Sequence, residues 1–127
     1  MIISASCGEG RYRVECQAIL CGEDVNAVFT GGERAHIGAV SLAVYEPVRD
    51  SATVSTMTVY AHRDDQLASQ AAKKLAVALK CTASASVGIH VDDADGHDIE
   101  YLCENFLLCL QELIRKIKNE KEPVEFE

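Results

Sequence analysis

The sequence predicts an α+β two-layer sandwich, in which a mostly antiparallel β-sheet carries two helices on one face. Two observations lead to this fold class. Over about the first sixty residues apolar side chains alternate with polar ones, which is the period of β-strands with one wet face. The apolar period then lengthens to three or four residues in two later segments, which indicates amphipathic helices near 64–80 and 96–120.

Four or five strands are expected before the first helix. The segments that alternate, or that are rich in β-branched residues, are 2–6, 12–20, 25–29, 37–45 and 52–60. A Gly-Glu-Asp turn at 22–24 and the glycine pair Gly31-Gly32 separate neighbouring strands, and Pro47 and Asp50 interrupt the later ones. Because the connections are short, neighbouring strands are expected to run mostly antiparallel.

The second half of the chain predicts a helix, a strand and a longer helix. In the first helix Leu67, Ala71, Leu75 and Leu79 recur every four residues. Asp64 or Asp65 is expected to cap this helix. Small and β-branched residues at 82–89 then predict another strand. Asp95, with Asp98 three residues later, forms an approximate capping box for the last helix.

Length and composition exclude several classes of protein. The 127 residues suit one domain, expected over 1–121, with 122–127 as a frayed tail. A net charge of −8 disfavours nucleic acid as a partner. The apolar runs are too short for a membrane span and the first residues lack the features of a signal peptide, so a cytoplasmic protein is expected. Six cysteines without a CxxC pair are interpreted as reduced, mostly buried thiols rather than metal ligands.

Three of the four histidines lie in short motifs where a predicted strand begins or ends. These motifs contain His36, His62 and His90. If the strands on either side of the first helix belong to one sheet, they run parallel and both end at the same edge. His62 and His90 then share that edge, and His36, at the start of an antiparallel strand, joins them. The topology therefore predicts a candidate site at one edge of the sheet.

The chemistry of this edge favours an anionic ligand that approaches the backbone closely. Both helices begin there, and their N-termini suit a phosphate or a carboxylate. The predicted binding residues are Gly31, Gly32, Arg34, His36, Gly38, His62, Gly88, His90 and Asp92. Each histidine also has a plainer interpretation, since a histidine at a strand end is commonly satisfied by a nearby carbonyl. Acidic neighbours such as Asp64 and Asp92 favour a cation or serve as helix caps.

Enzyme signatures are mostly missing, so a protein that is not an enzyme is favoured. The chain has no P-loop, no GxGxxG opening a helix, no GxSxG elbow and no HExxH. A metal site built from His36, His62, His90 and Asp92 stays open as a minor alternative, although no two of them have the local spacing of a known metal motif.

Several motifs, taken in order along the chain, resemble a known family. They are Gly8-Glu9-Gly10-Arg11-Tyr12, the turn Gly22-Glu23-Asp24, Gly31-Gly32 followed by His36-Ile37-Gly38-Ala39, His62 before acidic residues, and Gly88-Ile89-His90. Together they are similar to the small accessory proteins associated with gallate decarboxylase, described as prenylated-flavin chaperones, over about residues 8–110. The resemblance implies a fold like that of proteasome-assembly chaperones.

The resemblance also implies a function and partners. It predicts an accessory protein or chaperone that binds prenylated FMN and delivers it to a UbiD-type, gallate-like decarboxylase. A homo-oligomer is also expected. The alternative from another class is an assembly or interaction module that binds a protein partner through its sheet, with the histidines merely connecting loops.

Overall fold

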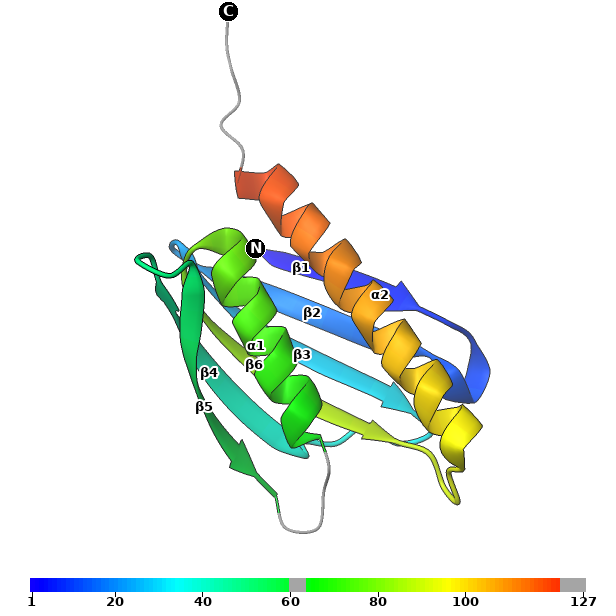
Figure 1. Cartoon of the computed structure of the whole chain (residues 1–127). Helices are drawn as coiled ribbons and strands as arrows, with labels where there is room; N and C mark the ends of the chain where they lie inside the picture. The colour runs from blue at the N-terminus through cyan, green and yellow to red at the C-terminus, as the bar shows by residue number, and fades with distance from the viewer. Residues whose placement is uncertain (60–63, 122–127) are drawn as a thin grey trace, which may run out of the picture.

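The computed structural model describes residues 1–59 and 64–121 and has the predicted α+β architecture (Figure 1). Its elements, in chain order, are β1 (Ile2–Cys7), the 3₁₀ turn η1 (Gly10–Tyr12), β2 (Val14–Cys21), β3 (Asp24–Gly32), β4 (Ala39–Glu46), β5 (Ser51–Thr58), α1 (Asp65–Leu79), β6 (Thr82–His90) and α2 (Gly96–Lys121). Each predicted strand and helix therefore has a counterpart. The predicted tail at 122–127 lies outside the described residues.

The six strands form one mixed sheet in the order β1-β2-β3-β6-β4-β5. Four of the strand pairs are antiparallel, and only β3 and β6 pair in parallel. β3 and β4 follow each other in the chain but are not neighbours in the sheet, because β6 lies between them. β5 and β6 nevertheless run in the same direction, with β4 between them, as the helix that connects them requires.

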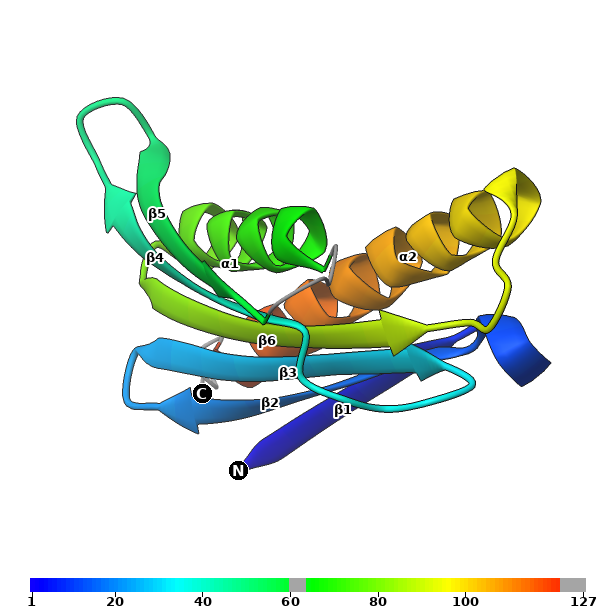
Figure 2. The same cartoon turned by 90° about the horizontal axis from the view of Figure 1, so that it is seen from below.

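Both helices cover the same face of the sheet, and the hydrophobic core lies between the two layers (Figures 1 and 2). α1 packs on β4, β5 and β6, whereas α2 packs on β1 and β2. The rings of Phe29 on β3 and Phe106 on α2 are both fully buried, with centroids 5.0 Å apart. Small side chains such as Ala83 and Ala85 on β6 let α1 approach the centre of the sheet closely.

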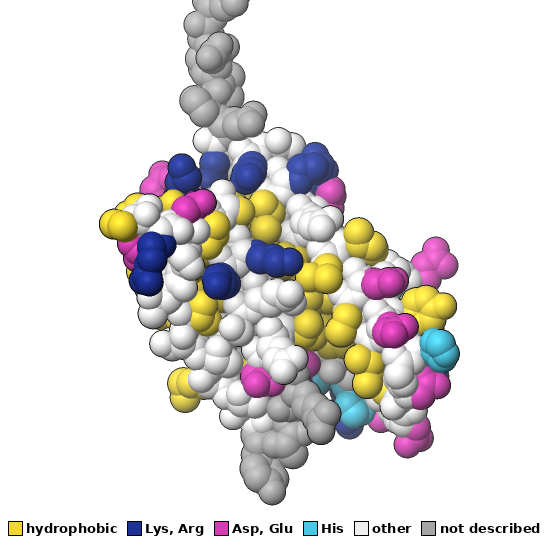
Figure 3. Space-filling model, in the orientation of Figure 1, with side chains coloured by type: hydrophobic (Ala, Val, Ile, Leu, Met, Phe, Trp, Pro, Cys, Tyr) yellow, Lys and Arg dark blue, Asp and Glu magenta, His cyan; other side chains and the backbone are white. Residues whose placement is uncertain are grey.

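The opposite face, called the outer face below, carries no helix (Figure 2). The side chains on this face alternate with the buried ones along β2, β3 and β4, and most of them are exposed to solvent. On the helix side, basic side chains gather toward the C-terminal end of α2 and acidic ones toward its N-terminal end (Figure 3). Cations stabilise the C-terminal end of a helix and anions its N-terminal end, so this distribution suits the dipole of α2. Asp98, in the first turn, is one of these acidic residues.

The starts of the two helices differ from each other. The capping box of α2 is confirmed, because the Asp98 N–H donates to the Asp95 carboxylate at 2.9 Å and the Asp95 N–H donates to the Asp98 carboxylate at 3.0 Å. The predicted cap of α1 is confirmed in position but not in its contact. Asp64 occupies the N-cap position, but its carboxylate makes no capping hydrogen bond. No helix in the described part of the chain is long and apolar enough to cross a membrane.

Candidate functional site

The candidate site is built around the segment 33–38, which connects β3 to β4 and crosses the outer side of β6 near its C-terminal end (Figure 2). Backbone hydrogen bonds hold this segment at both ends, from the Glu33 N–H to the His90 carbonyl at 2.7 Å and from the Gly38 N–H to the Val87 carbonyl at 2.9 Å. A side chain at Gly88 would overlap the His36 carbonyl, which explains the glycine in β6 at this position.

Asp64, at the start of α1, joins three elements through one carboxylate. Its Oδ1 accepts a hydrogen bond from the Ile89 N–H at 3.2 Å, and its Oδ2 lies 3.2 Å from His36 Nε2. The side chain of Asp64 is only 8% exposed and fills the space in which a Cβ at Gly38 would lie. The carboxylate therefore connects the helix, the end of β6 and the crossing segment.

His36 contacts hydrogen-bond acceptors through both ring nitrogens. Nδ1 lies 3.3 Å from the Arg34 carbonyl, and Nε2 lies 3.2 Å from the Asp64 carboxylate. The ring is 19% exposed. The surroundings of His36 thus orient it firmly between the crossing segment and α1.

His90 lies beside His36 but is held differently. The two ring centroids are 6.3 Å apart, with the rings nearly perpendicular. His90 Nε2 lies 2.7 Å from the carboxylate of Asp92, and this hydrogen bond is the main reason why the pKa of Asp92 falls below its ordinary value. The His90 side chain is 31% exposed and that of Asp92 is 72% exposed, so both are accessible from solvent.

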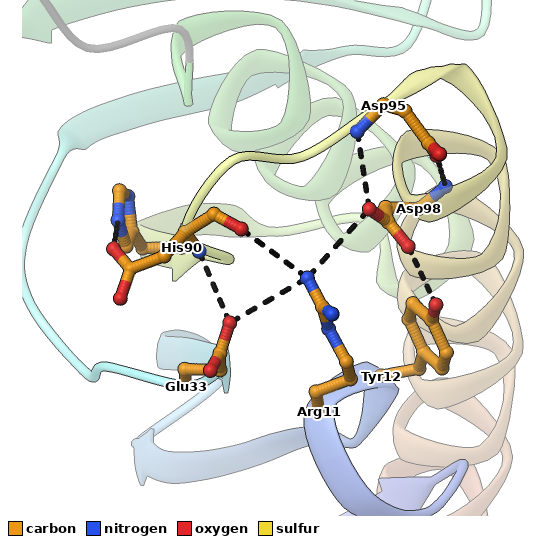
Figure 4. Close-up of polar contacts among 7 residues, drawn as sticks. Arg11, Tyr12, Glu33, His90, Asp95 and Asp98 are labelled. Carbon is orange, nitrogen blue, oxygen red and sulfur yellow. Dashed lines mark hydrogen bonds and ion pairs between the residues drawn. The ribbon is translucent and has the colours of Figure 1, made fainter.

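Arg11 forms a second centre of polar contacts beside the histidines (Figure 4). Its Nη2 lies 3.3 Å from the Asp92 carbonyl and 3.6 Å from both the Glu33 and the Asp98 carboxylates. Glu33 in turn accepts the Asp92 N–H at 3.1 Å. The arginine therefore ties the 3₁₀ turn to the crossing segment, the loop after β6 and the start of α2.

Tyr12 extends this network into the first turn of α2. Its hydroxyl donates to the Asp98 carboxylate, which raises the pKa of the Tyr12 phenol and lowers the pKa of Asp98. The backbone N–H of Asp95 lowers the pKa of Asp98 further. The Tyr12 ring also packs against Tyr101, with centroids 5.2 Å apart. Asp98 thus serves both as part of the helix cap and as an anchor for the 3₁₀ turn.

A small hollow of about 210 Å³ lies next to the histidines, at the end of β3. Its lining includes Gly31, Gly32 and Arg34 of the predicted set, together with Arg13. Arg13 is paired with Glu15 at 2.7 Å, whereas the exposed Arg34 contributes positive potential near Asp92. Backbone and guanidinium groups suit an anionic group of a ligand, but they share this hollow with the carboxylates of Glu15 and Glu33.

The expected meeting of His36 and His90 at one edge is confirmed, and Gly38, Gly88 and Asp92 lie with them. His62 lies outside the described residues. The space that the glycines leave open is filled by other parts of the chain. The Arg13 carbonyl lies against Gly31, the His90 carbonyl against Gly32, and the His36 carbonyl against Gly88. The Asp64 carboxylate lies against Gly38. Contact of these residues with a cofactor remains a prediction.

Sequence reasoning missed three residues that organise this edge. Arg11 and Glu33 appeared only within motifs, and Asp64 was interpreted as a helix cap. A lone arginine or glutamate in a turn has no diagnostic spacing, so no local signal could have identified them. Within 1–59 and 64–121, no group of three or more His, Cys, Asp or Glu side chains is arranged to hold a metal ion.

Comparison with solved structures identifies the fold first. One chain in the crystal structure of a novel chaperone complex for yeast 20S proteasome assembly matches with a TM-score of 0.62. The match covers 95% of this chain and 98% of that chain at 14% sequence identity, so it shows a shared fold. The expected likeness to proteasome-assembly chaperones is thereby confirmed for the fold.

The family follows from the sequence. A family model for the prenylated flavin chaperone LpdD-like domain matches residues 8–118, and the chain belongs to this family. The matched region contains every residue predicted for the site, from Gly31 to Asp92. The comparison with curated proteins found no match.

Proposed function

We propose that this protein is a cytoplasmic chaperone that binds prenylated FMN at the histidine edge and delivers it to a UbiD-type decarboxylase, and that it acts as a homo-oligomer. The observation that carries the proposal is the family match over residues 8–118, which spans the whole candidate site. Within the site, the guanidinium groups of Arg13 and Arg34 in the small hollow support an anionic ligand of this kind.

The residues of the small hollow fit the phosphate group of a flavin mononucleotide. A space of about 210 Å³ is sufficient for a phosphate and the start of a ribityl chain, but not for a tricyclic ring as well. Arg34 and Arg13 would meet the phosphate, with the backbone of Gly31 and Gly32 beside it. When bound, the prenylated flavin supplies the electron sink for decarboxylation in a partner enzyme; the role of this chain is to hold it.

The histidines would contact the part of the cofactor that extends beyond the hollow. His90 is the more accessible of the two, since its side chain is 31% exposed and, among the described residues, hydrogen-bonds to the solvent-exposed Asp92. An imidazole in this place donates to or accepts from the heteroatoms of a flavin. Tyr12, which is committed to Asp98 and Tyr101, is less suited to stacking on the ring.

Co-expression with a flavin prenyltransferase, followed by native mass spectrometry, tests this proposal. We expect the purified protein to retain a mass equal to that of prenylated FMN and to be coloured. His36→Ala and His90→Ala should each weaken binding by more than about 1 kcal/mol, because each removes a hydrogen-bonding group from the site. His97→Ala is the matched control, since His97 is an exposed histidine in the first turn of α2 and does not belong to the predicted set of binding residues.

Wild-type flavin affinity in both variants, with circular dichroism showing both to be folded, would refute binding at this edge. Flavin binding alone does not establish delivery. The second step is therefore tested by mixing the loaded protein with an apo-decarboxylase of the UbiD type and measuring the cofactor that the enzyme acquires. A chaperone that keeps its cofactor when the apo-enzyme is present contradicts delivery.

A second candidate function is protein assembly through the sheet, and one observation favours it. The outer face exposes aliphatic side chains, among them Leu42 and Val44 at nearly half of their accessible surface. A stable complex with another protein that forms equally well with and without flavin would support assembly, whereas flavin-dependent contact with a decarboxylase would support cofactor delivery.

A further inference from the structure

Two of the six cysteines meet inside the protein, between the sheet and the long helix. Cys16 lies on the helix-covered face of β2 and Cys109 lies in the middle of α2, 93 positions away in the sequence. Their Sγ atoms are 3.0 Å apart, within hydrogen-bonding contact. Both side chains are buried, with exposed fractions of 2% for Cys16 and 0% for Cys109. The proposed function does not use them.

Backbone atoms on three elements hold the two sulfurs toward each other. Cys109 Sγ lies 3.6 Å from the Ala5 carbonyl, and Cys16 Sγ lies 3.8 Å from the Cys109 carbonyl. Ala5 on β1 is the register partner of Cys16, and α2 packs on both strands at this half of the sheet (Figure 1). The sulfurs of a disulfide are about 2.05 Å apart, so this pair needs to close by only about 1 Å to form one.

The contact divides the protons unequally between the two thiols. The hydrogen bond to Cys109, together with burial, raises the pKa of Cys16, whereas the hydrogen bond to Cys16 lowers the pKa of Cys109. The positive charge of Lys116, further along α2, favours the thiolate at both positions. Because the thiolate is the form of cysteine that attacks an oxidant, Cys109 is the nucleophile of the pair and Cys16 is the thiol beside it.

A hollow in the surface reaches the layer in which this pair lies. Its volume is about 820 Å³, and its lining combines Ala5 and Cys16 of the sheet with Glu112 and Lys116 of α2. Lys116 also donates a hydrogen bond to the Ser4 carbonyl at 2.7 Å, so the hollow lies where α2 meets the edge strand β1. This opening offers a molecule as small as a peroxide a route toward the two sulfurs, whose burial keeps bulky reagents away.

We propose that Cys16 and Cys109 form a site of reversible oxidation, at which hydrogen peroxide produces a disulfide between β2 and α2. The Cys109 thiolate attacks one peroxide oxygen, the O–O bond breaks, and a sulfenic acid and a hydroxide form. The hydroxide takes up the proton that Cys109 had lost. The Cys16 thiol then attacks the Cys109 sulfur, the S–O bond breaks, and water leaves with the thiol proton. The two thiols lose two electrons in total, and the peroxide becomes two molecules of water.

The disulfide fastens α2 to the sheet and closes a long loop. A bridge between positions 93 residues apart restricts the unfolded chain strongly, and for a domain of this size the melting temperature should rise by roughly 15 °C. Dithiothreitol should reverse the rise, because it reduces the disulfide to the two thiols. The bridge forms in the absence of flavin, so it is independent of the proposed function.

Peroxide treatment of the reduced, flavin-free, full-length protein tests this site. The protein carries Cys21→Ser, so that its exposed thiol does not form bridges between molecules. The thiols that survive are labelled with a maleimide in denaturant and counted by intact mass. With one of the six cysteines replaced, we expect the number of labelled thiols to fall from five to three, without added oxygen, and the melting temperature to rise.

Two alanine variants and a matched control identify the pair. Cys16→Ala and Cys109→Ala should each abolish the loss of two thiols and the rise in melting temperature. Cys81→Ala is the control, since Cys81 is also buried, with 7% exposed, but lies between α1 and β6. This control should still lose two thiols and gain stability on oxidation.

Mass spectrometry of an unreduced digest decides the pairing even if an alanine variant fails to fold. We expect a cross-linked pair of peptides whose fragments place the bridge at Cys16 and Cys109. A thiol count that stays at five, oxygen addition instead of a bridge, or a bridge between other cysteines would each overturn the proposal. An unchanged melting temperature after oxidation would do the same, because the bridge would then not connect β2 and α2 in the folded protein.

Discussion

Replacing Asp64 by alanine tests whether one carboxylate holds the candidate site together. The substitution removes the acceptor of the Ile89 N–H and the partner of His36 Nε2, both at 3.2 Å. A hydrogen bond to a charged group contributes about 1.5–3 kcal/mol, and the Ile89 N–H would be left without its acceptor. Because the Asp64 side chain is only 8% exposed, water replaces these contacts poorly. We expect Asp64→Ala to reduce the free energy of unfolding by about 3 kcal/mol.

Urea unfolding, followed by circular dichroism at 222 nm, measures this loss. With an m-value of about 1.5 kcal/mol/M, a loss of 3 kcal/mol lowers the midpoint by about 2 M. Asp64→Asn keeps one oxygen for the Ile89 N–H but places an amide against His36, so about half of the loss is expected. Asp65→Ala is the control, because Asp65 begins the same helix without a hydrogen bond of this kind.

The comparison between Asp64→Ala and Asp65→Ala decides whether the reasoning holds. If Asp64→Ala and Asp65→Ala shift the midpoint equally, the carboxylate of Asp64 acts only through the general charge of the helix start, and the connection between α1, β6 and His36 is refuted. A double-mutant cycle with His36→Ala isolates the contact between the two side chains. A coupling energy near zero would show that the 3.2 Å contact contributes nothing to stability.

Four further predictions concern other parts of the molecule. Gly88→Ala should destabilise the protein strongly, because the added methyl overlaps a backbone oxygen, while Gly96→Ala, where a Cβ meets nothing, should leave the melting temperature almost unchanged. Tyr12→Phe should raise the pKa of Asp98 toward 3.8 in an NMR titration, since the phenol hydrogen bond is its largest cause of lowering. Because the pKa of Asp98 is lower in the folded state than in the unfolded state, its carboxylate stabilises the protein at pH values above the unfolded-state pKa. This stabilisation is lost as the pH falls through the folded-state pKa, so Asp98→Asn should flatten the acid limb of the stability curve below about pH 4. Cys21, which is exposed, should account for the fastest reaction with a thiol reagent, and a fast phase that persists in Cys21→Ser would contradict this assignment.

The sequence period predicted the elements but not the order of the strands. Alternation reports which face of a strand is buried, and it carries no information about which strand lies next to it. Segment 82–90 shows this limit: its small residues indicated close packing, yet its position between β3 and β4 could not be deduced. The histidine edge was predicted correctly because strand direction alone determines the end at which a residue lies, whichever strands are neighbours.

The role of Asp64 could not be predicted for a related reason. An aspartate directly before a helix is usually an N-cap, and an N-cap residue has an extended backbone. Here Asp64 has φ −76° and ψ −5°, which are helical values and turn the side chain away from the first free N–H groups. The carboxylate then reaches the Ile89 N–H across the end of β6, a contact between residues 25 positions apart that no local pattern encodes.

The two central histidines differ in what holds them, and this difference assigns them different tasks in the proposed chaperone. His36 is held by a carboxylate that is 8% exposed and by a backbone carbonyl, so exchanging its partners for those of a ligand disrupts buried contacts. His90 is held by Asp92, a carboxylate that is 72% exposed and that regains its hydration when it is released. A ligand can therefore take the place of Asp92 at little cost. We expect His36→Ala to reduce both stability and flavin affinity, whereas His90→Ala should reduce affinity while the unfolding curve stays close to that of the wild type.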